Sequence, residues 1–510
     1  MDTGFYYIYK SNVPITAGNI QSSTYLGRVP FNFFYDYRFT YSSVDHATRY
    51  LVTNDNPKTV VGPSQNVFVM NCTVQNATTY FAVRTDYGKT SPNWSVIPGA
   101  NSIEDGFGVK QHLDPIRAYL QEANAQYPGS ANGETIDVYI HYGSKIAVGS
   151  YPDMTNEGCL PFHFGIIKSG NVGGNNICML KFHGGNGNFI SNALSSVVAN
   201  SWKISFDDWF PNFNLGDTGY NSKWFGYHEK FDVYNATTSS PTPTSGTVRS
   251  YTYKRVKWEF NWIKKNWPGT IDTNSVYLVG SSQGCAGVWL NSMLDAKTFA
   301  AGNATDGKLN MDAPNDDNPE CKYNDTSNAR IDIRVMWGNE DATNLITDVP
   351  KVGNPSQYYK IYDLTNIGTM LGTLKNYSLP YLAAINGKED ATTCWEEKIP
   401  VYASVNTNLT GGRYYWDLRG HSGGVDNMWP PLAVTSMQRY RANLSYPAFS
   451  NCTLDGDPGD MNNPLPPYYD GDDIGAVNGN IDWVDSTIVD SASVWQIRLF
   501  EFQVTLNDGS

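Results

Sequence analysis

The chain has 510 residues, with 36 Lys plus Arg against 49 Asp plus Glu and a formal net charge of −13. An acidic chain without a dense basic cluster disfavours nucleic acid as a partner. No apolar run reaches the roughly 18 residues that a membrane helix needs. The length predicts about two to four structural units, one of which can be a large domain.

The composition is typical of a secreted protein that faces a carbohydrate or another polymer. Charged residues make up 17% and aromatic residues 14% of the chain. The opening MDTGFYYIYK lacks the cationic and apolar pattern of a signal peptide. Either the protein is cytosolic or a signal peptide has been removed. From the composition we expect a secreted monomer whose signal is absent from this sequence, with no membrane and no nucleic acid among its partners.

The seven cysteines are scattered singly, so no CxxC pair suggests a zinc or redox site. An odd count permits up to three disulfides and one free thiol. Cys285 is the expected free thiol, and Cys159 with Cys178 or Cys321 with Cys394 are candidate pairs.

Residues 1–100 are predicted to form a β-sandwich-like module. Segments such as GFYYIYK, STYLGRVPF and TTYFAVRTDYG are rich in β-branched and aromatic residues between Asn, Gly and Pro. Tyr6, Ile8, Pro14 and Ile15, with the closing TTYFAVRTDYG, resemble the middle and final strands of a fibronectin type III module. The first strands of that pattern are missing.

Residues 101–440 are predicted to form an α/β domain. The segment 113–127 carries apolar residues at helical spacing, IDVYIHYG, FHFGIIKSG and NICMLKFHGG follow as strands, and YKRVKWEFNWIKKNWPG is a helix that Pro268 and Gly269 stop. This alternation indicates a sheet with helices on its faces. Residues 295–330 and 350–413 are polar and irregular, which favours surface insertions or a lid.

Residues 441–510 are predicted to be β-rich, with NGNIDW and VWQIRLFEFQVTL as strands. The acidic stretch before them is a solvated loop or a structural calcium site, since a hard cation prefers clustered carboxylates. The EF-hand spacing is not met. The candidate ligands are Asp455, Asp457, Asp460, Asp470, Asp472 and Asp473.

The stretch VYLVGSSQGCAGVW places Gly280-Ser281-Ser282-Gln283-Gly284 between an apolar strand and a helix of small residues. A sharp turn strains its central residue, and glycines two positions before and after remove side chains that would collide. The N-terminus of the following helix favours a developing negative charge. Ser282 is therefore a candidate nucleophile.

These residues resemble the α/β-hydrolase superfamily, and within it the secreted esterase and polyhydroxyalkanoate depolymerase-like group. The resemblance covers roughly residues 110–440 and implies a mostly parallel central sheet. It also implies a triad in the chain order Ser, acid, His. His421, in WDLRGHSGG, is the only histidine after Ser282, so it is the predicted base.

The predicted acid is Asp341. Ile331, Ile333 and Val335 alternate as a strand, and the turn WGNED that follows is similar to the His-Gly-x-x-Asp turn of the group. Trp337 stands in place of that histidine. Glu340 is the alternative acid.

The oxyanion donors are expected from two segments. Gln283 follows the nucleophile, and the glycine-rich HGGNG after the strand MLKF is similar to the oxyanion loop of the family. Gly185 or Asn186 would give the second donor, whereas His183 precedes the serine and is expected to be structural.

Several aromatic residues lie between this loop and the elbow, including Trp202, Trp209 and Trp224. They are either core residues or the lining of a cleft on which sugar rings or polyester chains stack.

Three functions are open. The first is a secreted serine carboxylic-ester hydrolase acting on a polyester or an acylated polysaccharide, without a required cofactor. The second is a serine peptidase of the prolyl-oligopeptidase type, although about 100 residues of β structure cannot supply its N-terminal propeller. The third is a non-catalytic polymer-binding protein on a hydrolase scaffold.

Overall fold

The computed structural model describes most of the chain from residue 4 to residue 504. The described residues are 4–31, 33–38, 49–86, 93–113, 116–128, 133–169, 174–194, 201–210, 220–311, 328–421, 423, 434–444, 446, 456–460, 471–478, 481–482 and 503–504. Among them, no helix combines the length and apolar character that a membrane crossing requires.

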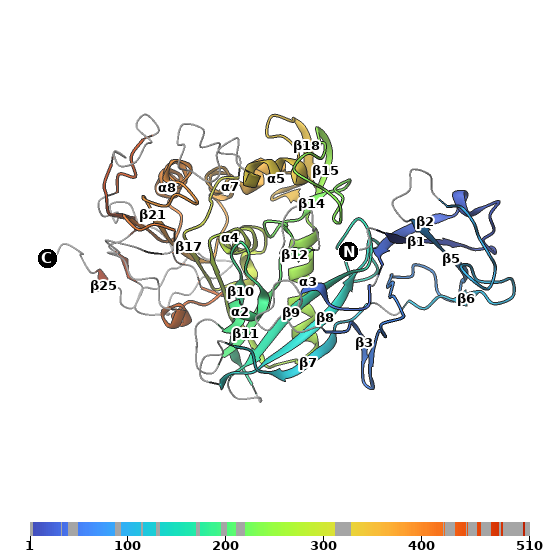
Figure 1. Cartoon of the computed structure of the whole chain (residues 1–510). Helices are drawn as coiled ribbons and strands as arrows, with labels where there is room; N and C mark the ends of the chain where they lie inside the picture. The colour runs from blue at the N-terminus through green and yellow to red at the C-terminus, as the bar shows by residue number, and fades with distance from the viewer. Residues whose placement is uncertain are drawn as a thin grey trace.

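A ten-stranded sheet with the order β23-β22-β21-β17-β16-β10-β11-β9-β8-β7 forms the centre of the molecule (Figure 1). The run from β22 to β11 is parallel throughout, and β7, β8, β9 and β23 pair antiparallel with their neighbours. The predicted mostly parallel sheet is thus confirmed. Its strands are β7 (Tyr119–Ala125), β8 (Ile136–Gly143), β9 (Leu160–Lys168), β10 (Asn176–Phe182), β11 (Ser201–Phe206), β16 (Ile271–Ser281), β17 (Ala301–Thr305), β21 (Tyr381–Gly387), β22 (Gly412–Asp417) and β23 (Gly475–Val477).

Both faces of this sheet are covered, because alternate side chains of the central strands are apolar on each side. In β10, Cys178, Leu180 and Phe182 belong to the main core, which includes side chains of the helices α3, α4, α7 and α8. Met179 points into a second cluster with Tyr277. The helices are α2 (Phe189–Leu194), α3 (Tyr251–Asn266), α4 (Gly284–Leu294), α5 (Asn328–Trp337), α6 (Ile361–Thr365), α7 (Ile367–Leu374) and α8 (Ile399–Thr407).

A separate antiparallel sheet, in the order β2-β1-β5-β6, forms the lobe that lies opposite the α8 end in Figure 1. It comprises β1 (Phe5–Ser11), β2 (Thr24–Pro30), β5 (Thr78–Asp86) and β6 (Val109–Lys110). The β character expected for the N-terminal residues is therefore present. The resemblance to a fibronectin type III module and the predicted domain boundaries stay predictions.

Small sheets complete the described structure. One joins β14 (Tyr227–His228), β15 (Ser245–Arg249) and β18 (Asn344–Thr347). The others are pairs of short strands, namely β3 (Val52–Asp55) with β4 (Lys58–Val60), β12 (Trp209–Phe210) with β13 (Tyr220–Asn221), β19 (Pro350–Lys351) with β20 (Asn354–Tyr358), and β24 (Ile481–Asp482) with β25 (Gln503–Val504).

Two predicted elements have the opposite type. The segment expected to be a helix, 113–127, contains strand β7, which pairs with β8 and extends the central sheet. The segment expected to be a strand, around Ile333, is helix α5. Its residues Ile333, Met336 and Trp337 are buried at i, i+3 and i+4, which is a helical rather than an alternating pattern.

The range 350–413 is not a surface insertion. It supplies the central strand β21 and the helices α6, α7 and α8. Every residue of β21 is buried. Residues 312–327, in the other predicted insertion, lie outside the described residues.

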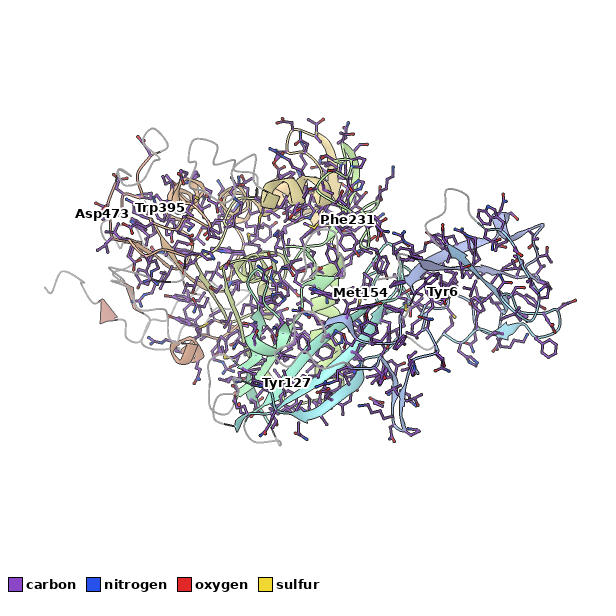
Figure 2. The ribbon with its side chains drawn as sticks, in the orientation of Figure 1. Tyr6, Tyr127, Met154, Phe231, Trp395 and Asp473 are labelled. Carbon is purple, nitrogen blue, oxygen red and sulfur yellow. The ribbon has the colours of Figure 1, made fainter. Side chains whose placement is uncertain are left out.

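Besides the pairing of β23 with β22, two tryptophans hold the C-terminal part against the main body. Trp395 Nε1 donates to the carbonyl of Pro458 at 2.9 Å, and Trp416 Nε1 donates to that of Asp472 at 2.8 Å. Trp395 and Asp473 both lie at the end of the molecule opposite Tyr6 (Figure 2). Most of the predicted C-terminal strands fall outside the described residues.

Candidate active site

Ser282 lies in a strained turn between β16 and α4. Its φ is +55°, a left-handed conformation that costs a non-glycine residue free energy. Its N–H donates to the carbonyl of Thr305 at 2.8 Å, which anchors the turn to β17.

The two glycines of the motif are required by close backbone approaches. A Cβ on Gly280 would lie 2.3 Å from the carbonyl oxygen of Gly284, and a Cβ on Gly284 would lie 2.2 Å from that of Phe182. Both separations are shorter than a carbon can tolerate. The turn can therefore form only where these two positions lack a side chain.

His421 contacts the Ser282 hydroxyl directly. His421 Nε2 lies 2.8 Å from Ser282 Oγ, and its Nδ1 lies 2.9 Å from Asp390 Oδ2 and 3.1 Å from Asp390 Oδ1. Ser282 follows β16, Asp390 follows β21 and His421 follows β22. These strands are parallel, so their carboxyl ends bring the three side chains to one edge of the sheet.

The carboxylate that orients His421 is Asp390, and the prediction of Asp341 is wrong. Asp341 is exposed in the turn after α5, and the alternative Glu340 pairs with Arg334 at 3.0 Å. The error arose because the segment before Asp341 is a helix and not a strand of the central sheet. The available signal was the apolar run YLAAI followed by the turn NGKED, which is a strand end of the kind that carries an acid.

The surroundings of Asp390 favour its ionised form. Its side chain is buried, and burial alone would raise its pKa. Lys398, His421 and the Thr393 hydroxyl and N–H outweigh burial and hold the pKa below its usual value. Lys398 Nζ lies 3.3 Å from Asp390 Oδ2, and the Thr393 N–H donates to Oδ1 at 2.9 Å. An ionised Asp390 can stabilise a positively charged His421.

A second buried carboxyl, Asp306, follows β17 at the same edge of the sheet. Burial raises its pKa to about 7, an effect that Lys398 opposes and Asp390 reinforces. Asp306 Oδ1 has no hydrogen-bond partner within the described residues. Sequence reasoning did not single out this residue.

The predicted oxyanion segments lie against the nucleophile. A Cβ on Gly184 would be 3.4 Å from Ser282 Cβ, and one on Gly185 would be 3.7 Å from Gln283 Oε1. Asn186 and Gly185 are exposed, and Asn186 has a φ of +58°. Gln283 precedes the first residue of α4, where backbone N–H groups have no acceptor within the helix.

His183 supports this loop and does not contact Ser282 in the described hydrogen bonds. Its Nδ1 lies 2.8 Å from the carbonyl of Gly184, and its Nε2 lies 3.0 Å from Asp207 Oδ1. Burial alone would raise the pKa of Asp207, but Arg38 and His183 together hold it below its usual value. The expectation that His183 is structural agrees with these contacts.

The three tryptophans do not line a cleft. Trp202, Trp209 and Trp224 are 2%, 4% and 1% exposed, so they belong to the core. Trp224 packs edge-on against His183 and donates from Nε1 to the His183 carbonyl at 3.2 Å. The proposed stacking role is therefore wrong for these residues, because their faces are covered by neighbouring side chains.

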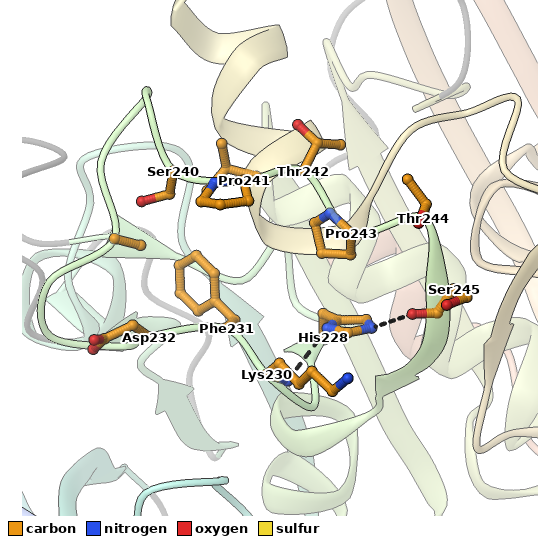
Figure 3. A pocket seen from close by; sticks show the side chains of 12 residues that line it. His228, Lys230, Phe231, Asp232, Ser240, Pro241, Thr242, Pro243, Thr244 and Ser245 are labelled. Carbon is orange, nitrogen blue, oxygen red and sulfur yellow. Dashed lines mark hydrogen bonds between the residues drawn. The ribbon is translucent and has the colours of Figure 1, made fainter.

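Two cavities lie away from the Ser282 hydroxyl. One, of about 390 Å³, is lined by the segment 240–245 together with His228, Lys230, Phe231, Asp232, Ala236 and Val335 (Figure 3). His228 Nε2 donates to the Ser245 carbonyl at 3.1 Å there. Neither this cavity nor one of about 720 Å³ beside α3 is lined by a residue of the Ser282 site.

The cysteines differ partly from expectation. Cys285 is a buried free thiol, as predicted. Cys159 and Cys178 are also free, so their predicted pairing is wrong, and burial raises the pKa of Cys159 to about 12. Cys394 is in a disulfide, and its candidate partner Cys321 lies outside the described residues.

The calcium hypothesis stays a prediction. Within the described ranges, no group of three or more His, Cys, Asp or Glu side chains is arranged to hold a metal ion. Asp457 and Asp472 are joined instead by a hydrogen bond from the Asp457 N–H to Asp472 Oδ2 at 2.8 Å. Asp455 and Asp470 lie outside the described residues.

No family model and no curated protein matches the chain. Among solved structures, S-formylglutathione hydrolase from Agrobacterium tumefaciens is 10% identical, with a TM-score of 0.37, over 57% of this chain and 90% of that one. Acetyl xylan esterase from Paenibacillus sp. R4 is 13% identical, with a TM-score of 0.35, over 61% of this chain and 85% of the esterase. Acylaminoacyl peptidase from Pyrococcus horikoshii is 11% identical, with a TM-score of 0.35, over 72% of this chain and 53% of the peptidase.

At these levels of similarity, the fold assignment rests on the chain's own topology and site geometry. A serine in a strained strand-to-helix turn, an acid and a histidine follow in that chain order after three parallel strands of one sheet. The chain therefore has the α/β-hydrolase fold.

Proposed function

We propose that the chain is a serine carboxylic-ester hydrolase that works through an acyl-enzyme. The observation that carries the proposal is the position of His421 between the Ser282 hydroxyl and the buried carboxylate of Asp390. A serine hydroxyl is a weak nucleophile at neutral pH, and such a base and orienting acid activate it.

Ser282 Oγ attacks the ester carbonyl carbon while His421 Nε2 takes the hydroxyl proton. The tetrahedral oxyanion receives hydrogen bonds from the Gln283 N–H and from the loop at Gly185 and Asn186. The bond to the alcohol then breaks, and His421 gives its proton to the leaving oxygen. Water attacks the acyl-enzyme with His421 as base, which releases the acid and restores the Ser282 hydroxyl. This cycle needs no cofactor.

We further propose a polyester or an acylated polysaccharide as the substrate, with the enzyme secreted and monomeric. The aromatic and weakly charged composition supports a polymeric substrate. A peptidase of the prolyl-oligopeptidase type is not favoured, because the one four-stranded sheet and the hairpin that the described N-terminal residues form cannot supply the several blades of a propeller.

The test compares wild type, Ser282→Ala and Ser281→Ala on p-nitrophenyl acetate, butyrate and octanoate. We expect wild type and the matched neighbour variant to release nitrophenolate, and Ser282→Ala to lose at least 10³-fold of kcat, as for removal of a catalytic nucleophile. Retained activity in Ser282→Ala would place the nucleophile elsewhere. The preference for chain length would separate acetylated polysaccharides from longer-chain polyesters.

A further inference from the structure

Asp208 is a buried carboxylate that lies behind the oxyanion segments and takes no part in the proposed chemistry. It follows β11 and is 1% exposed. Its backbone nitrogen lies 2.9 Å from Nε2 of His183, the histidine that opens the glycine-rich loop.

The carboxylate of Asp208 joins two other segments, the one at residues 222–224 and the one that follows Ser282. Oδ1 accepts from the Ser222 N–H at 3.1 Å and from the Ser222 hydroxyl. Oδ2 accepts from the Trp224 N–H at 2.8 Å and from Gln283 Nε2 at 3.2 Å. Trp224 in turn holds the His183 carbonyl. One carboxylate thus connects the loop before Gly185 with the residue that follows Ser282.

Gln283 is held at both ends of its amide. Its Nε2 donates to Asp208, while its Oε1 accepts from Lys223 Nζ at 3.1 Å. The side chain is 8% exposed, and the amide orientation follows from a carboxylate on one side and an ammonium on the other. Hydrogen bonds to charged groups in a buried site are stronger than neutral ones.

We propose that Asp208 is the positioning residue of the oxyanion hole: through Gln283, Trp224 and His183 it fixes both donor segments relative to Ser282. This inference rests on the proposed function. Donors act only when they are already aimed at the place where charge develops, and a displacement of about 1 Å can cost roughly 100-fold in rate.

Asp208→Asn tests the proposal. The substitution keeps the shape of the side chain but removes its charge. In either orientation of the new amide, its NH2 group faces N–H donors, either that of Ser222 or those of Trp224 and Gln283, which in the wild type meet a carboxylate oxygen. We expect kcat on p-nitrophenyl acetate to fall by roughly 10- to 100-fold with KM within about threefold, since the loss concerns the transition state. A purely structural role would instead lower the melting temperature while the folded fraction kept its kcat.

Two further variants keep the test decisive. Gln283→Met retains the length and the backbone N–H but cannot bond Asp208, so it should lower kcat in the same way even where Asp208→Asn fails to fold. Asp208→Asn with Gln283→Glu exchanges donor and acceptor, while Lys223 still meets an oxygen. This double variant should recover part of the lost kcat, although the Trp224 N–H remains less well paired.

The outcomes separate the inference from the proposed function. Active wild type, a kcat loss in Asp208→Asn or Gln283→Met, and partial recovery in the double variant would support a positioning role. Wild-type kcat in Gln283→Met, or a double variant no better than Asp208→Asn, would overturn it while leaving the esterase intact. Absence of turnover in wild type would overturn both.

Discussion

At the scale of single residues, the identity of the acid decides the chemistry. Asp390 is buried and contacts His421, whereas Asp341 is exposed in a distant part of the sequence after α5. Asp341 lies within a turn and Asp390 directly follows one, so the turn residues themselves do not separate the two carboxylates. Only Asp390 follows a strand that runs parallel to the one before Ser282 in the same sheet.

Asp390→Asn should therefore lower kcat by about 10³- to 10⁴-fold with little change in substrate binding, because an amide stabilises the wrong form of the imidazole. Asp341→Asn is the matched control and should keep kcat within about twofold. The measurement is steady-state hydrolysis of p-nitrophenyl butyrate by both variants. A large loss in the control alone would restore the acid predicted from the sequence.

At the scale of elements, helix α4, which begins directly after the nucleophile turn, packs closely against strand β10. Gly287 lies on the buried face of α4, where a Cβ would be 2.3 Å from a ring carbon of Phe182. The absent side chain lets the helix approach the strand that ends in the oxyanion loop. Close packing of α4 on Phe182 therefore explains why Gly284 and Gly287 lack side chains.

Gly287→Ala should destabilise the fold by about 1–3 kcal/mol through overpacking. Gly372→Ala in α7 is the matched helical control, because its Cβ would meet only Asn408 Nδ2 at 3.9 Å. The free energy of unfolding of that variant should rise by about 0.4–1 kcal/mol, since alanine favours the helix and restricts the unfolded chain. Urea unfolding of the two variants measures both effects, and a stable Gly287→Ala would contradict the proposed packing.

At the scale of the whole molecule, ionisable groups are buried between the central sheet and α3. His141 Nε2 lies 2.7 Å from Glu259 Oε1, and both side chains are inaccessible to solvent. Burial raises the pKa of Glu259 to about 8, against the opposing effect of Arg255, and burial lowers the pKa of His141. The core therefore favours the neutral forms of both groups.

This arrangement predicts that stability falls as the pH rises above about 6.5. Between the ordinary pKa of 4.5 and the folded value of about 8, the folded state keeps a proton on Glu259 that the unfolded chain releases. This proton makes the free energy of unfolding decrease as the pH rises. Below the ordinary pKa of 6.5 the neutral, buried His141 has the opposite effect, because the unfolded chain binds a proton there that the folded state does not, so the net decrease is expected between about pH 6.5 and 8. Melting temperatures from pH 6.5 to 8 should show the decrease in wild type and a smaller one in Glu259→Gln.

Glu104→Gln, at an exposed position, is the control and should keep the wild-type slope. Part of the slope should persist in Glu259→Gln, because burial also raises the pKa of Asp306 to about 7. An identical slope in wild type and Glu259→Gln would show that Glu259 is ionised in the folded protein.

The sequence by itself determined the features that depend on neighbouring residues. The elbow at Ser282, with glycines at positions 280 and 284, and the free thiol of Cys285 follow from local sterics and burial. The strands β10 and β16 were evident because buried parallel strands form continuous apolar runs, and β8, although antiparallel to both neighbours, is a similar buried run. His421 was reached by elimination, since one histidine follows Ser282.

The tertiary structure decided what depends on contacts between distant segments. Strand order in the sheet places Asp390 beside His421, and sheet pairing makes a strand of β7 where the spacing of apolar residues favoured a helix. The burial of Trp202, Trp209 and Trp224 likewise depends on what packs over them. Local patterns report which side chains prefer to be buried, whereas the partners that bury or orient them are brought together only by the folded chain.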